Sequence, residues 1–143
     1  MSDFLDVTTL IRKALEERLQ SLQPAMDTAF ENTKYEPKPD CPYQRAFLLP
    51  APSQSIGFTG RARDFVRETG IFQISLYYPI NEGTREAGSR AEAIRNHFRR
   101  GTTLISGGIK VITERGSVAT ALREGTWHVL PVSIPYYSNI LIS

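Results

Sequence analysis

The sequence predicts an α+β fold, in which two main helices pack on a largely antiparallel, mixed β-sheet. Two segments, residues 3–22 and 84–100, repeat apolar residues at helical spacing. The segments between and after them alternate apolar with other residues and are rich in β-branched and aromatic side chains, as strands are. Glycine-containing turns separate the last strands at hairpin spacing, which makes neighbouring strands antiparallel.

Length and composition indicate a single domain over residues 1–143. Hydrophobic residues make up 41% of the chain and charged residues 22%, which is enough apolar surface for a core. The formal net charge of +2 is too small to require a nucleic-acid partner by itself. Because Cys41 is the only cysteine, no internal disulfide can form, which fits a reducing compartment.

The N-terminal segment carries acids early, at Asp3 and Asp6, which is the wrong charge for a signal peptide. No apolar run approaches the roughly 20 residues of a membrane span. We therefore expect a soluble protein that is made in the cytoplasm and has no membrane partner.

The first helix is predicted over residues 3–22. Asp3 and Asp6 suit the positive end of its dipole, and Pro24 ends it. Arg18 lies in the middle of its apolar face. Two alternatives stay open for Arg18: its head extends to water at the rim of that face, or it forms a buried or inter-subunit ion pair.

The central part of the chain is predicted to alternate strands and loops. Residues 27–31 and 43–49 are expected strands, and the prolines between them predict an extended loop over residues 34–42. Residues 51–60 are rich in Pro, Ser, Gln and Gly and predict a surface loop. Residues 61–78 then predict one long strand, or a bent pair broken near residues 69–70.

The second helix is predicted over residues 84–100. Its narrow apolar stripe contains two alanines, which would allow close approach to a sheet. Glu86 and Arg90 have the spacing of an i,i+4 ion pair on the helix surface. Gly101 is a natural C-cap.

The last third of the chain is predicted to be strands only. Two glycine-containing turns, at residues 106–108 and 124–126, mark two hairpins. Pro131 lies inside the last strand and cannot donate a ladder hydrogen bond, so this strand should lie at a sheet edge or carry a bulge. The predicted strands are residues 102–105, 109–113, 118–123 and 127–136.

No residues show the spacing of a catalytic or metal-binding set. His97 and His128 are far apart and belong to no ligand-spaced cluster, so we expect both to be structural or exposed. Nothing in the sequence pairs Cys41 with a base that would activate its thiolate. The Gly107-Gly108 pair lacks the Gly-Lys-Ser/Thr sequence of a phosphate loop. We therefore predict no enzyme, no catalytic residue, no cofactor and no metal.

Arginines gather around residues 61–67 and along the second helix, but acidic residues interrupt both groups. One interpretation is a solvated surface of mixed charge. The other is a subunit interface or a passage for a polyanion, in which Arg61 and Arg63 face a shared channel.

Several short sequence segments also occur in a characteristic order. They are AFEN before the proline loop (29–32), FLLP (47–50), RETGIFQISLYYP (67–79), FRRGT (98–102) and WHVLPVSIPY (127–136). Together with the order of the elements, they resemble the small tail terminator, or tail completion, proteins of long-tailed bacteriophages. The resemblance covers nearly the whole chain, and no single motif within it is diagnostic.

The resemblance implies a structural protein of the virion, located at the junction of tail and head. Such proteins assemble as a ring, commonly of six subunits, on the finished tail tube. The ring ends tube polymerisation and forms the joint to the head connector, and DNA passes through it. The implied partners are other copies of the chain, the major tail tube protein, the head–tail connector protein and DNA that is bound without sequence recognition.

A ring of this kind needs a heterologous interface that is made of two different, complementary patches. We expect the residue 51–63 loop, the flank of the first helix and the apolar C-terminal residues to contribute, although the last of these could equally pack on the chain's own core. A lumen that meets DNA should be positive or neutral. The candidate interface residues are Arg18, Ile56, Phe58, Ile140, Leu141 and Ile142, and the candidate lumen residues are Arg61 and Arg63.

Three other functions stay open. The chain could be another head–tail joining or minor tail protein of similar size. A small nucleic-acid-binding or regulatory α+β protein would bind free DNA as a monomer, in a salt-sensitive manner. An enzyme would require a deep pocket that holds Cys41 together with a histidine.

Overall fold

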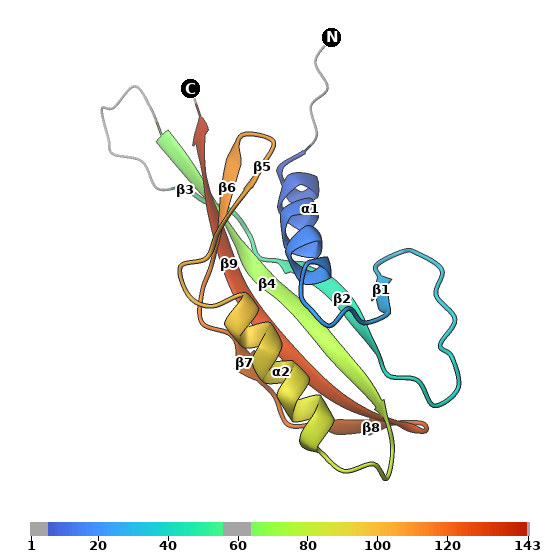
Figure 1. Cartoon of the computed structure of the whole chain (residues 1–143). Helices are drawn as coiled ribbons and strands as arrows, with labels where there is room; N and C mark the ends of the chain where they lie inside the picture. The colour runs from blue at the N-terminus through green and yellow to red at the C-terminus, as the bar shows by residue number, and fades with distance from the viewer. Residues whose placement is uncertain (1–5, 56–63, 143) are drawn as a thin grey trace.

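The computed structural model describes the backbone of residues 6–55 and 64–142. Within these residues, two helices and one mixed sheet confirm the predicted α+β class (Figure 1). No helix of the described part is long and apolar enough to cross a membrane. The elements are α1 (Val7–Gln20), β1 (Thr28–Phe30), β2 (Tyr43–Pro50), β3 (Gln54–Ser55), β4 (Asp64–Pro79), α2 (Arg85–His97), β5 (Thr103–Ser106), β6 (Ile109–Thr113), β7 (Ser117–Val118), β8 (Leu122–Glu124) and β9 (Trp127–Ile142).

The sheet is organised around β4 and β9, which are 16 residues long each and pair along their whole length. The strand order is β1-β2-β4-β9-β6-β5, with β3 on β4 and with β7 and β8 on β9. Among the described strands, only β1 and β2 pair in parallel; the other pairs are antiparallel. β4 and β9 run diagonally through the whole molecule as one long ribbon (Figure 1).

Both helices lie on the same face of this sheet (Figure 1). Alternate residues of the central strands point toward them, because successive side chains of a strand point to opposite faces. Phe72, Ile74 and Leu76 of β4 are fully buried in this way, and Val132 and Ile134 of β9 face the helices beside them. This face is called the helix face below, and the other is called the open face.

Helix α1 begins at a true N-cap. The Asp6 carboxylate accepts a hydrogen bond from the Thr9 amide at 2.7 Å, which satisfies one of the free N–H groups of the first turn. The predicted position Asp3 lies outside the described residues. The helix ends at Gln20, with Ser21 as its C-cap, just before Pro24.

Helix α2 ends at His97, three residues before the predicted end, and Phe98 takes the C-cap position. The expected Glu86–Arg90 surface pair is wrong. Arg90 points inward and is 7% exposed, because its guanidinium donates to Pro24 O at 2.6 Å. Gly101, which was predicted as the C-cap of this helix, lies beyond it and adopts a positive φ of 85° in the turn toward β5.

The predicted edge position of the last strand is wrong. The alternative of a bulge holds only on the side away from β4, where the facing strands have one extra residue at each of the two prolines, Pro131 and Pro135. β9 lies between β4 and the group β6, β7 and β8, and its register with β4 is continuous. The neighbouring strands are interrupted opposite the prolines: Pro131 O accepts from the Ala119 amide after β7, and Pro135 O accepts from the Glu114 amide before it. The prolines lack an N–H group, and they face these interruptions, where no regular ladder hydrogen bond is required. For the same reason the predicted strand 118–123 is in fact two short strands, β7 and β8.

Of the two alternatives predicted for residues 61–78, one long strand is confirmed over the described residues: β4 has no break at residues 69–70. Gly70 lies opposite Tyr136 of β9 and Pro50 of β2. A Cβ atom at Gly70 would lie 2.5 Å from Tyr136 Oη and 2.6 Å from Leu49 O. The glycine therefore lets the Tyr136 ring cross the strand closely, and it does not interrupt the sheet.

Candidate functional site

Arg18 joins the ends of the two helices. Its Nε and Nη2 atoms donate to His97 O at 3.0 and 2.9 Å, and His97 Nε2 lies 2.7 Å from Arg18 O. The guanidinium is therefore neither extended into water nor paired with a carboxylate of the described residues. It satisfies a free carbonyl at the negative end of α2. A role of Arg18 between subunits stays a prediction.

The same contact determines the protonation of His97. Since Arg18 O can only accept, Nε2 carries the proton. Burial lowers the pKa of His97, and the nearby charges of Arg18 and Arg90 lower it further, although the bond to Arg18 O acts in the opposite direction. The histidine is structural, as expected.

The C-terminal candidates Ile140, Leu141 and Ile142 belong to β9. Ile140 pairs with Val66, and the backbones of Leu141 and Ile142 continue the ladder with β4. Ile140 is half-buried. The remaining candidates, Ile56, Phe58, Arg61 and Arg63, lie outside the described residues, so their interface and lumen roles stay predictions.

The basic surface expected along the second helix is smaller than predicted. Arg90 is buried. Arg95 is paired with Glu92 at 2.8 Å, and its Nε donates to Gly116 O. Arg99 and Arg100 follow the helix and are exposed.

Exposed apolar side chains occur at three separate places on the open face of the sheet, and one of these places is an apolar patch formed by Leu49 and Ile71. Leu49 and Ile71 are opposite each other on β2 and β4, and Ile71 is opposite Pro135 of β9. By the register of the strands, Ile105 of β5 and Leu122 of β8 point to the same face. These exposed side chains could not be recognised from the sequence, because apolar residues occur on both faces of these strands and only the fold shows which face is covered. The exposed fractions are 48% for Leu49, 37% for Ile71, 73% for Ile105 and 52% for Leu122.

One end of the open face is closed by a second cluster of aromatic side chains. Tyr43 and Tyr77 stack with their ring centroids 4.7 Å apart, and Tyr35 from the proline loop and Trp127 pack against Tyr43. Burial, followed by the charge of Glu124 and its hydrogen bond, raises the pKa of Tyr77 to about 12. This end is therefore part of the folded core and not a free surface.

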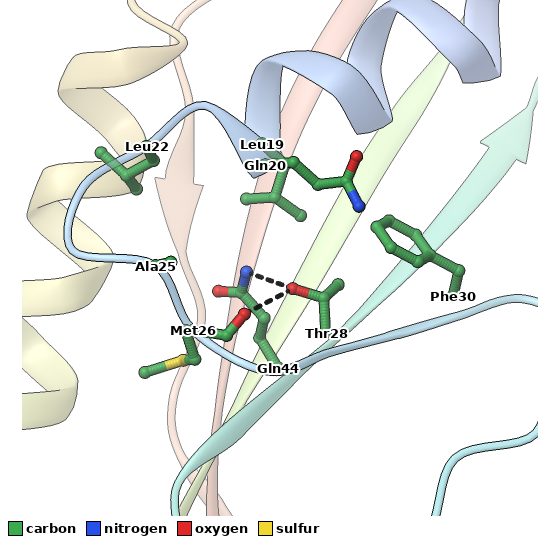
Figure 2. A pocket seen from close by; sticks show the side chains of 8 residues that line it. All are labelled: Leu19, Gln20, Leu22, Ala25, Met26, Thr28, Phe30 and Gln44. Carbon is green, nitrogen blue, oxygen red and sulfur yellow. Dashed lines mark hydrogen bonds between the residues drawn. The ribbon is translucent and has the colours of Figure 1, made fainter.

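A pocket of about 270 Å³ opens beside β1. Figure 2 shows mostly apolar walls from the end of α1, the following segment and β1. Its polar groups are the exposed Gln20 amide, the Thr28 hydroxyl and the buried Gln44 amide, which donates to Thr28 Oγ1 at 2.9 Å, while Thr28 donates to Met26 O. The pocket is therefore of mixed character, with an apolar part formed by Leu19, Leu22, Met26 and Phe30. Its lining residues are Leu19, Gln20, Leu22, Ala25, Met26, Thr28, Phe30 and Gln44.

The groups considered for chemistry are dispersed. Across residues 6–55 and 64–142, no group of three or more His, Cys, Asp or Glu side chains could hold a metal ion. Cys41 is exposed, and the residues that line the pocket at His128 include no cysteine. The distinctive features of the described molecule are its surfaces: a sheet with one covered and one open face, an apolar patch and a pocket of mixed character.

These features define a small α+β protein whose notable sites are contact surfaces. In a comparison with known protein families, a family model described as "Phage tail terminator protein" matches residues 10–136. The chain therefore belongs to the phage tail terminator protein family, which confirms the predicted resemblance and indicates a structural role in a phage tail.

The comparison with solved structures supports the fold. One solved protein matches with 29% sequence identity and a TM-score of 0.71, over 92% of this chain and 94% of that chain. Comparison with the curated proteins finds no matching sequence.

Proposed function

We propose that this chain caps the phage tail tube as a ring, most simply of six copies, ends tube polymerisation and forms the joint to the head connector. The observation that carries the proposal is the family match over residues 10–136, which spans α2, most of α1 and most of the sheet. The chain acts there by shape and surface complementarity and makes or breaks no covalent bond.

The described surfaces support such a role. A ring requires contacts to two neighbouring copies through different patches, and it also contacts the tube and the connector. The apolar patch around Leu49 and Ile71 and the pocket beside β1 are separate surfaces available for such contacts. The partners we propose are other copies of this chain, the major tail tube protein and the head–tail connector protein, all within the virion at the tail–head junction.

DNA is the remaining proposed partner. It would pass through the ring without sequence recognition, since contacts to phosphates carry no direct sequence information. Arg61 and Arg63 remain our candidates for the lumen.

Electron microscopy of tails tests this function. Phage that lack the chain are expected to produce tubes of uncontrolled length that do not join heads, and supplying the wild-type chain should restore both properties. Tails of normal length that join heads normally would contradict the proposal. Tails of normal length that fail to join heads would contradict the capping role and favour a head–tail joining protein instead.

A further inference from the structure

The two ends of the sheet carry opposite charge. β1 lies at one end of the strand order and β5 at the other. Residues 27–40, which comprise β1 and the proline loop, contain four acids and two lysines, so their net charge is −2. Residues 99–115, which comprise β5, β6 and their flanks, contain four basic residues and one acid, so their net charge is +3. The charged residues are Asp27, Glu31, Lys34, Glu36, Lys38 and Asp40 at one end, and Arg99, Arg100, Lys110, Glu114 and Arg115 at the other.

Part of the negative charge is paired within the chain. Arg12 binds Glu31, Lys38 binds Asp27 at 3.4 Å, and Lys34 lies 3.9 Å from Glu36, so among the described residues only Asp40 of these four acids has no ion pair. Glu16 lies near Arg12 and Glu31 and offsets the charge that Arg12 adds. At the positive end, Arg99, Arg100 and the other basic residues are all exposed. The difference in sign between the two ends therefore remains.

The positive end also carries a protruding apolar side chain. Ile105 is 73% exposed, which is the highest value among the exposed large apolar residues of the described chain. It lies directly opposite Lys110 in the β5–β6 hairpin. The tight Gly107-Gly108 turn, with φ of 55° and 86°, fixes this pair near the end of the hairpin.

The negative end carries the pocket of Figure 2, whose lining includes Met26 and Phe30. In the sequence, Asp27 follows Met26 and Glu31 follows Phe30. The pocket volume of about 270 Å³ is far above the roughly 10–15 Å³ that holds a single water molecule, so an aliphatic side chain can enter it. The apolar part of the pocket would remove that side chain from water.

We propose that these two ends are the two halves of a head-to-tail contact between copies of this chain, in which Ile105 of one copy enters the pocket beside β1 of the next. The inference rests on the proposed ring, which requires two different and complementary patches on one chain. A second copy is the occupant because the same chain supplies the apolar guest, a pocket with an apolar part and opposite charges around them. Opposite charges favour this orientation over the contact of two like ends.

Disulfide trapping on tails tests the contact directly. In a Cys41→Ser background, Ile105→Cys is placed on one set of chains and Gln20→Cys, at the exposed rim of the pocket, on another. Tails assembled from the mixture should form the 105–20 disulfide on mild oxidation, with loss of that band when either variant is used alone. Formation of 105–105 or 20–20 disulfides in its place, or of no disulfide, would overturn the contact.

A charge placed on the guest gives an independent readout. Ile105→Asp should abolish control of tail length while the free chain keeps its circular dichroism spectrum and thermal midpoint. The matched control is Val118→Asp, because Val118 is also an exposed apolar residue but lies away from both ends of the sheet. Normal tail length with Ile105→Asp, or an equal loss with both variants, would contradict the inference.

The outcomes separate the two proposals. If phage without the chain show the tail defect but the 105–20 disulfide does not form, the capping function stands and this contact is wrong. If the disulfide forms but removal of the chain leaves tails normal, the contact stands and the capping function is wrong.

Discussion

At Gly70, three strands and an aromatic ring come close together. It pairs with Pro50 on one side and Tyr136 on the other, and the Tyr136 ring lies over it. Burial is the first cause that raises the pKa of Tyr136, to about 12. The packing of this tyrosine thus depends on the missing side chain of its neighbour.

Substitution of Gly70 tests this dependence. Gly70→Ala should destabilise the chain by about 1–3 kcal/mol, because the new methyl group overlaps Leu49 O and the Tyr136 ring. Gly88→Ala is the matched control: Gly88 lies inside α2 with open space around it, so alanine should stabilise by about 0.5–1 kcal/mol. Urea denaturation of both variants measures these changes. Equal effects of the two substitutions would exclude the steric explanation.

His97 makes stability depend on pH. Its pKa in the folded chain lies below the ordinary value of 6.5, so the unfolded chain binds the proton more readily. The stabilisation is complete above the unfolded pKa and is lost as pH falls through the lower, folded pKa. Protonation places a positive charge beside the guanidinium of Arg18. His97 and Arg18 together form the hydrogen bonds that join the two helices.

The measurement is the free energy of unfolding of wild type and His97→Gln between about pH 7.5 and pH 5. The wild type should lose stability more steeply than the variant, whose amide can still donate to Arg18 O but does not titrate in this range. Asp6 and Glu31, whose pKa values are lowered, add a further loss at more acid pH that both proteins share. Parallel curves over this range would show that His97 does not contribute.

At the scale of the element, α2 depends on a buried arginine. Arg90 spans from the helix to the segment that follows α1, where it donates to Pro24 O, and its Nη2 lies 3.4 Å from the buried Gln44 amide oxygen. Burial is the first cause that lowers the pKa of Arg90. Its Nε has no hydrogen-bond partner among the described residues, so the position is polar but incompletely satisfied.

Arg90→Met should therefore destabilise the chain by about 1–3 kcal/mol, because Pro24 O loses its donor while the apolar part of the side chain is kept. Arg85→Met, on the exposed first turn of the same helix, should change stability by no more than about 0.5 kcal/mol. Thermal denaturation of the two variants provides the comparison. A neutral Arg90→Met would mean that methionine packing fully replaces the buried hydrogen bonds.

The sequence predicted most elements because each has its own local signal. The alternation in β4, the periodicity of α1 and the Gly107-Gly108 turn depend on neighbouring residues only. Arg90 was misassigned although its spacing placed it beside the apolar stripe, three residues after Ala87 and four before Ile94; its charge outweighed that signal. Pro131 was misassigned because the gap that accommodates it lies in the facing segment, between β7 and β8, and leaves no mark on the pattern of the last strand itself.

The candidate surfaces were less predictable, for a physical reason. The pocket beside β1 forms where the end of α1, the segment after it and two strands meet. A pattern of neighbouring residues cannot predict that these separate segments come together. Likewise, Leu48 and Leu49 are equally apolar, but one is 4% and the other 48% exposed because the helices cover only one face. The family resemblance rested on the order of short sequence segments and did not depend on these details.

At the scale of the whole molecule, stability should be greatest along β4 and β9. Their central residues, such as Phe72 and Ile134, are fully buried and have neighbouring strands on both sides. Hydrogen exchange followed by mass spectrometry should therefore find the slowest amides in the middle of these strands and faster exchange in β1 and β5 at the two ends of the sheet. Exchange in β4 as fast as in β5 would contradict this order.

The uninterrupted pairing of β4 with β9 also has a mechanical consequence. At roughly 3.4 Å per residue, a strand of 16 residues extends about 50 Å. A force that slides the two strands past each other loads all their cross-strand bonds at once, whereas a force that peels one end apart breaks the bonds in sequence. The chain therefore has a stiff direction, along which a pull or thrust can be carried from one end of the molecule to the other.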